Sequence, residues 1–415
     1  MSPMALLLVL LVLAYIGSLW STSGGRRAFG SPSGIEYVVL GALLGPHALG
    51  ALSYAAMAAF EPIAIVALGW IGLIFGLECG LVGDRRAPLG RMSLGLAFTL
   101  VTGGVCACAA WYVLGWLRLH DAETRLVLSG AIALVSVETT RHAMQWISEQ
   151  HMLSGGLAGL VLDLEAADDA PVLVALAVLF SLLSGPHQLF GLALPALAMA
   201  GFSLGTGVVL GGVSAYLIAK DASPVERWTV LLGSVWLATG MARSLGLSAM
   251  ATTFALGATL SAFSRDGEKL REQIGLTEGA VLLPALLLAG AHLRRPEGEG
   301  EMLLIGVALA LRVSMSFLFG VGLSLKRKET RGLGFWLGAG MLAPGSLTIV
   351  VGFAIALRCP PQIARPALAI AFLGTLLGEF VGPRALKQVL GRFNSAPAQP
   401  RPTDRGAGPG LEHTS

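Results

Sequence analysis

The chain has 415 residues, of which 54% are hydrophobic and 13% are charged, and its formal net charge is +3. A soluble domain carries roughly 25% charged residues, so most of this chain is predicted to lie in lipid. The small net charge and the lack of a basic tract interleaved with aromatic residues argue against nucleic acid as a partner. The four cysteines form no CxxC pair, so no zinc site, disulfide framework or cofactor is predicted.

Thirteen apolar segments are near or above the length needed to cross a bilayer. In chain order they are Met4–Trp20, Ile35–Ser53, Pro62–Leu81, Met92–Leu117, Arg125–Ile147, Gly155–Leu183, Leu189–Ile218, Trp228–Arg243, Leu247–Phe263, Gly279–Leu293, Met302–Leu325, Gly332–Leu357 and Ala364–Leu390. With the N-terminus outside, the inside loops hold seventeen Lys and Arg residues and the outside loops hold seven. The sequence therefore predicts an all-α polytopic membrane protein with a cytoplasmic C-terminus and a disordered tail, 393–415.

Two adjacent carboxylates lie at the centre of the sixth segment. Asp168 and Asp169 follow Asp163 and Glu165 within a few residues. A charge at that depth costs at least about 2.5–3.5 kcal/mol on insertion scales. Such groups persist in membranes where they face a cavity, pair with a cation or hold a proton. If residues 163–169 were an acidic loop instead, the apolar run before them would be too short to span the bilayer. The pair therefore predicts an ion or proton site.

A single charge, Arg312, lies at the centre of the eleventh segment. A buried arginine needs an anionic partner, and Asp168 or Asp169 is the natural one at this depth. Snorkelling of the side chain to an interface is disfavoured, because the interface lies about 15 Å away in either direction.

Two other segments are interrupted near their centres. The fifth is interrupted at Ser136, Glu138 and Thr139, and the twelfth is interrupted at Pro344, Gly345 and Ser346. Pro and Gly break a helix, and Ser and Thr hydroxyls satisfy the freed backbone groups. A pair of interrupted helices points to a transporter site. Because the two are seven segments apart, they cross the bilayer in opposite directions, as an inverted repeat requires.

The motifs along the chain resemble those of the monovalent cation:proton antiporter superfamily, in its bacterial thirteen-helix branch. The resemblance covers roughly residues 4–390 and rests on the order and spacing of Gly41-Ala-Leu-Leu-Gly45-Pro46, Phe75-Gly-Leu-Glu78, Asp168-Asp169, Arg312, Leu337-Gly-Ala-Gly340 and Gly378-Glu379-Phe-Val-Gly382-Pro383.

The resemblance implies an exchanger domain, 1–392, in a bacterial inner membrane. Its scaffold helices, within 4–83 and 226–293, would form a homodimer. Its core helices, within 90–185 and 301–390, would move as an elevator, joined to the scaffold by a linker helix within 189–220. The resemblance also implies that Asp169 carries the ion or proton and that Asp168 pairs with Arg312.

The chemistry of the residues agrees with exchange. Two adjacent carboxylates in a low-dielectric site cannot both ionise freely, so protons compete there with a dehydrated Na+, K+ or Li+. Ser136 and Thr139 would add oxygen ligands, and Glu165 shares a helix face with Asp169. A sodium-coupled organic-anion symporter of the same architecture and an ion channel remain alternatives. An enzyme is not predicted, because adjacent aspartates diverge by about 100° around a helix and so do not face one another as a catalytic pair would.

Overall fold

The computed structural model describes residues 33–80, 89–118, 120–137, 169–183, 187–189, 192–218, 223–264, 267–326, 334–342 and 345–394, together with residues 8, 9, 12, 15 and 16. The predicted first segment, Met4–Trp20, therefore lies almost wholly outside the described residues. The same holds for the second half of the fifth segment and the first half of the sixth.

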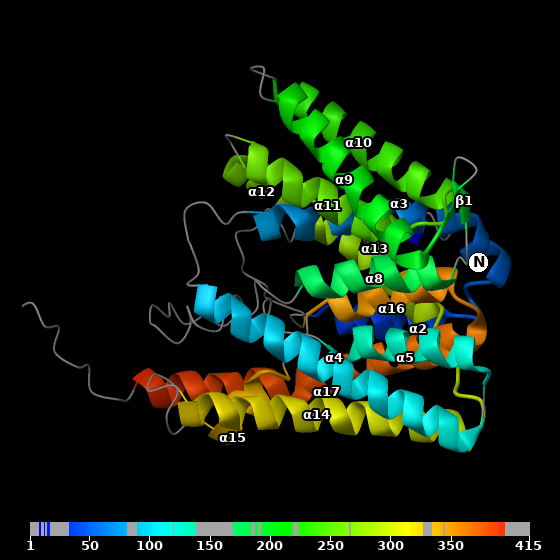
Figure 1. Cartoon of the computed structure of the whole chain (residues 1–415), viewed down its shortest axis with the longest axis vertical. Helices are drawn as coiled ribbons and strands as arrows, with labels where there is room; N and C mark the ends of the chain where they lie inside the picture. The colour runs from blue at the N-terminus through cyan, green and yellow to red at the C-terminus, as the bar shows by residue number, and fades with distance from the viewer. Residues whose placement is uncertain are drawn as a thin grey trace, which may run out of the picture.

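The described elements are almost all helices (Figure 1). They are α2 (Ile35–Leu44), α3 (Tyr54–Gly80), α4 (Leu89–Leu117), α5 (Ala122–Ser136), α8 (Asp169–Leu183), β1 (His187–Leu189), β2 (Leu192–Leu194), α9 (Ala196–Ile218), α10 (Pro224–Ser244), α11 (Ala249–Phe263), α12 (Gly267–Gly275), α13 (Glu278–Ala291), α14 (Glu299–Lys326), α15 (Gly334–Gly340), α16 (Leu347–Arg358) and α17 (Pro361–Asn394).

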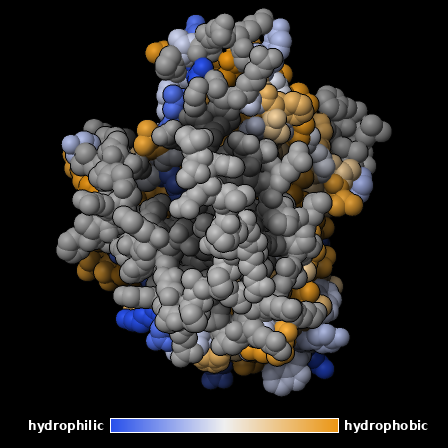
Figure 2. Space-filling model, turned by 90° about the vertical axis from the view of Figure 1, so that its left-hand side faces the viewer, coloured by the Kyte–Doolittle hydropathy of each residue, from blue (hydrophilic) through white to orange (hydrophobic). Residues whose placement is uncertain are grey.

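The all-α membrane class is confirmed, and the number thirteen stays a prediction. Within the described residues, five helices (α3, α4, α9, α14 and α17) are long and apolar enough to cross a membrane on their own. Shorter apolar helices, among them α8, α11 and α16, lie between them. Viewed from the end of the molecule where α17 finishes, the described apolar side chains gather along its flanks (Figure 2).

Three local predictions need correction. The seventh segment becomes helical only at Ala196, because its start pairs as an antiparallel hairpin, β1 with β2. The eighth segment is longer than predicted, because a capping box of Ser223 and Glu226 starts α10 at Pro224. The loop after α11 contains a further helix, α12, which buries Leu270 and Ile274.

The first group of helices is packed through glycines. A Cβ on Gly72 or Gly76 of α3 would overlap the backbone of α11, and a Cβ on Gly207 or Gly211 of α9 would do the same. Small residues let membrane helices approach backbone to backbone. The helix α11 is therefore held between α3 and α9 (Figure 1). In the same way Gly41 of α2 and Gly290 of α13 let these two helices pack closely. The helix α10 covers α9 and α11.

The second group consists of α4, α5, α14, α15 and α17, in the lower half of Figure 1. Gly338 of α15 lies against the backbone of Phe317 in α14. Arg365 of α17 forms an ion pair with Glu301 of α14 at 3.7 Å. The helices α8 and α16 lie between the two groups: α8 contacts α9 and α5, and α16 contacts α13 and α17. The described residues of the predicted site lie in the second group and at the starts of α8 and α16.

Candidate functional site

Two helices end or begin in the protein interior, as their sequences predict. The helix α5 ends at Ser136, where the following residue, Val137, is extended with φ −97° and ψ 115°. The helix α15 ends at Gly340, and α16 begins at Leu347 after the N-cap residue Ser346. The helices α5 and α16 contact each other; the last carbonyl groups of α5 and the first N–H groups of α16 have no partner within their own helices.

The hydroxyl groups at these helix ends have no nitrogen or oxygen hydrogen-bond partner within the described structure. Ser136 and Ser346 are each 1% exposed, and the Oγ of each is buried and unpaired. A third buried hydroxyl without a partner belongs to Thr375 of α17. A buried polar atom left unpaired costs about 1–3 kcal/mol, so each of these oxygens is available to a ligand.

The described part of the acid pair is Asp169, the first described residue of α8, and it is buried. Pro171, two residues further on, and Val137, next to Ser136, line the same groove between α4, α5 and α8. The helices α5 and α8 contact each other, so the buried carboxylate of Asp169 and the end of α5 belong to neighbouring helices. Oxygen ligands of this kind suit a hard cation.

Arg312 reaches this region from the middle of α14. Its side chain is buried, and its Nη1 donates a long hydrogen bond of 3.5 Å to the carbonyl oxygen of Val135. That carbonyl belongs to the last turn of α5, where a cation is favoured by the helix dipole. Room for the guanidinium is provided by Gly374 of α17, on which a Cβ would lie 2.7 Å from Nη1. The positive charge of Arg312 thus compensates the partial negative charge of the carbonyl groups at the end of α5.

Of the remaining predicted residues, Gly345 is described and is buried between α15 and α16, and the others have no described geometry. Asp163, Glu165, Asp168, Glu138, Thr139 and Pro344 lie outside the described residues, so the predicted pairing of Arg312 with Asp168 stays a prediction. The structure adds Cys106 of α4, whose buried thiol lies against Ser136 and within electrostatic range of Arg312. It also adds Gly374 and Thr375. The sequence does not single out Gly374 and Thr375 as site residues, because many predicted spans of this chain contain a small residue followed by a hydroxyl residue.

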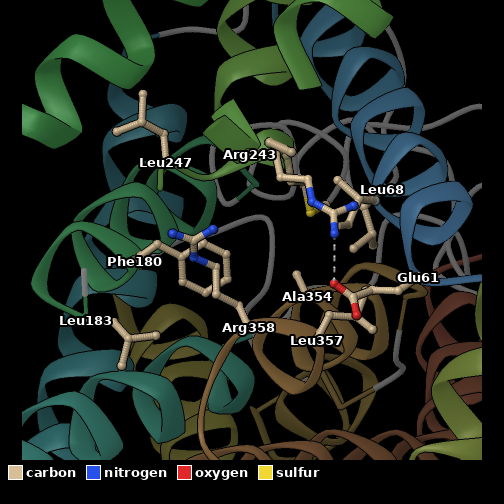
Figure 3. Close-up of a pocket in the computed structure, with 12 residues that line it drawn as sticks. Glu61, Leu68, Phe180, Leu183, Arg243, Leu247, Ala354, Leu357 and Arg358 are labelled. Atoms are coloured by element: carbon tan, nitrogen blue, oxygen red, sulfur yellow. Dashed lines mark hydrogen bonds and ion pairs between the residues drawn. The ribbon is translucent and has the colours of Figure 1, made fainter. Parts of the chain in front are cut away.

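A cavity of about 500 Å³ lies at the far ends of α8 and α16 from the site. Glu61 of α3 forms an ion pair with Arg243 of α10 at 3.5 Å (Figure 3). Arg358, the last residue of α16, lies over the ring of Phe180 and donates to the carbonyl oxygen of Gly246. The cavity is therefore a space with charged side chains between the first group of helices and the ends of α8 and α16.

Comparison with solved structures identifies the fold. The chain is similar to the structure of the sodium proton antiporter MjNhaP1 from Methanocaldococcus jannaschii at pH 8, with a TM-score of 0.64 and 15% sequence identity. The match covers 95% of this chain and 100% of that one. An electron-microscopy map of the same antiporter matches with a TM-score of 0.60. No family model matches the sequence, and a search of curated proteins finds no match. The chain thus has the fold of this antiporter and is a multi-pass membrane protein.

Proposed function

We propose that this chain is a secondary transporter that exchanges a monovalent cation, Na+, K+ or Li+, for protons. The observation that carries the proposal is Asp169, a buried carboxylate at the start of α8, an apolar helix that contacts the interrupted helix α5. Burial of a carboxylate without a cation or a proton is costly. The likeness of the fold to the sodium proton antiporter MjNhaP1 supports the same function.

Exchange follows from competition for one group. A proton neutralises Asp169, and so does a dehydrated cation that takes further oxygen ligands from Ser136, Thr139 and Glu165. The two occupants exclude each other, because both bind the same carboxylate oxygens. The empty site retains its charge, and moving that charge through the low-dielectric interior is unfavourable. Reorientation therefore takes place with one occupant or the other bound.

Arg312 and Asp168 would complete the site. Arginine effectively does not lose its proton in proteins, so Arg312 stays charged throughout the cycle. Its contact with the last turn of α5 fixes its position. Paired with Asp168, it would hold that carboxylate ionised and leave Asp169 as the group that exchanges. We expect one proton to be exchanged for each cation.

Alternating access would follow from movement of the core helices, within 90–185 and 301–390, against a scaffold within 4–83 and 226–293. The helix within 189–220 would be the linker. The charged cavity between the scaffold helices α3, α10 and α11 and the ends of α8 and α16 would be the opening on one side of the membrane. The scaffold would form a homodimer in a bacterial inner membrane, with the N-terminus outside and the C-terminus in the cytoplasm.

Dye-reported proton flux in everted membrane vesicles tests this function. Addition of Na+, K+ or Li+ should release protons in vesicles with the wild-type protein, and Asp169→Asn should abolish the response because it removes the ionisable group. Glu299→Gln is the matched control, since Glu299 is an exposed carboxylate at the start of α14. Wild-type flux in Asp169→Asn would refute the assignment. Sodium-dependent uptake of an organic anion without a dye response would identify a symporter.

A further inference from the structure

The helices α4, α5 and α8 enclose a groove that the exchange mechanism does not use. Its volume is about 730 Å³, and its walls are almost wholly apolar, with Leu100, Ala107, Tyr112, Ala133 and Leu182 among the lining residues. A pocket that binds one small molecule typically has a volume of 300–1,000 Å³. The groove is therefore large enough for one ligand with a long apolar part.

The groove faces the lipid. Leu100 and Tyr112 on its rim are 61% and 77% exposed, and both lie on α4, a helix long and apolar enough to cross the membrane. In a membrane protein such apolar exposed side chains contact acyl chains. The ligand that reaches this groove most directly is therefore a lipid.

One end of the groove carries a positive charge. Arg125, in the first turns of α5, places its guanidinium 4.2 Å from the ring centroid of Trp111, which lines the groove. Its Nε is buried and has no hydrogen-bond partner, and no carboxylate pairs with Arg125 within the described residues. Gly115 leaves space beside it, since a Cβ there would lie 3.2 Å from Nη1. This cation, held on an aromatic ring, is free to bind an anion.

The groove has the depth of one leaflet. From Leu126 to Val137, both of which line it, α5 advances about 16 Å at 1.5 Å per residue, and half of a bilayer's hydrocarbon core is about 15 Å. Its inner end is formed by Val137 and Pro171. Val137 follows Ser136 directly and Pro171 is two residues after Asp169 in the chain, so the bottom of the groove is close in sequence to the proposed ion site.

We propose that this groove binds one membrane phospholipid, with an acyl chain between α4, α5 and α8 and the phosphate on Arg125. Arg125, close to the end where α4 finishes and α5 begins, matches a phosphate at the leaflet surface, and the apolar walls below it match the chain. The end of the chain packs against Val137 and Pro171, so occupancy supports the interrupted end of α5 and modulates the rate of exchange.

Native mass spectrometry of the purified full-length protein, titrated with phosphatidylglycerol in detergent, tests the site. Gly104 lines the groove and has no atom within 4 Å of an added Cβ, so Gly104→Phe fills the groove without disturbing the helices. The matched control is Gly306→Phe, because Gly306 of α14 is equally open and lies outside the groove. We expect Gly104→Phe to retain one phosphatidylglycerol fewer than the wild type, and Gly306→Phe to retain the same number.

A second variant tests the phosphate contact without a change in the groove. Arg125→Gln should weaken binding of that phosphatidylglycerol about tenfold, because a charge-assisted hydrogen bond is replaced by a neutral one. Equal lipid retention by Gly104→Phe and the wild type would overturn the proposal, and so would an unchanged affinity in Arg125→Gln. The readout is lipid binding, so the result does not depend on the transport function proposed above.

Discussion

Replacing Gly374 by alanine should impair transport while leaving the protein folded. The new Cβ would lie 2.7 Å from Nη1 and 3.3 Å from Cζ of Arg312, whereas ordinary contacts between heavy atoms are about 3.5–4.0 Å. The guanidinium must therefore move by about 1 Å. Its hydrogen bond to the carbonyl oxygen of Val135 is already 3.5 Å long and would be lost. The partly negative carbonyl groups at the end of α5 then lose their contact with the positive charge of Arg312.

The size of the effect follows from that one interaction. Hydrogen bonds to charged groups contribute about 1.5–3 kcal/mol, and the lower figure applies here because the bond is long. Since about 1.4 kcal/mol corresponds to a factor of ten in rate, exchange should slow about tenfold. Folding should be preserved, because alanine is about 1 kcal/mol better than glycine in a helix interior and only the end of a flexible side chain has to move.

The assay is cation-driven proton flux in proteoliposomes, with thermal stability measured on the same preparations. Gly322→Ala is the control, since Gly322 of α14 has no neighbour within 4 Å of an added Cβ. In an Arg312→Lys background, Gly374→Ala should have little further effect, because lysine lacks the Nη1 that clashes. Wild-type flux in Gly374→Ala, or full additivity of the two substitutions, would refute the reasoning.

Three further predictions concern single residues. Arg312→Lys introduces a base that can lose its proton when buried. The charge moved after a cation jump, measured as current on a solid-supported membrane, should therefore differ from that of the wild type. An identical current would contradict the proposal that Arg312 stays charged throughout the cycle. Ser136→Ala should lower cation affinity about tenfold in flux titrations, with little loss of thermal stability, because the Ser136 hydroxyl has no partner within the described structure. Gly257→Leu should lower the yield of folded protein or its melting temperature, because a Cβ there would overlap the backbone of α3 at Leu73 and Leu77; normal melting would contradict that packing.

The sequence predicts those parts of the site that depend on residues lipid does not tolerate. Asp169 and Arg312 are charges in apolar segments, and both are buried in the structure. Proline, glycine and serine around Ser346 predict the interruption between α15 and α16. Each of these signals is local, because the cost of placing a charge or a broken helix in lipid is set by the segment itself.

Other features depend on contacts between distant segments and could not be predicted. Gly41 and Gly45, which belong to the motif of the second segment, lie against the backbone of α13, so their role here is close packing. Glu78, in the motif of the third segment, pairs with Arg271 of α12 at 3.2 Å, and α12 itself was not predicted. The contact of Arg312 with the carbonyl oxygen of Val135 could not be predicted either, because every residue has a backbone carbonyl and the sequence does not show which one a side chain will reach.

The fixed charges at the ends of the interrupted helices help to determine whether the proposed exchange depends on the membrane potential. Carbonyl groups at the ends of α5 and α15 are partly negative, and the N–H groups at the start of α16 are partly positive. The contact of Arg312 with the last turn of α5 makes that arginine part of this fixed arrangement. Asp169 then gains one positive charge whether it binds a proton or a monovalent cation. Each half of a one-for-one cycle carries the same charge in opposite directions, and the net charge moved is zero. A transported charge would be driven by about 2.3 kcal/mol per 100 mV, so the proposed exchange should respond to the pH and cation gradients and not to the membrane potential.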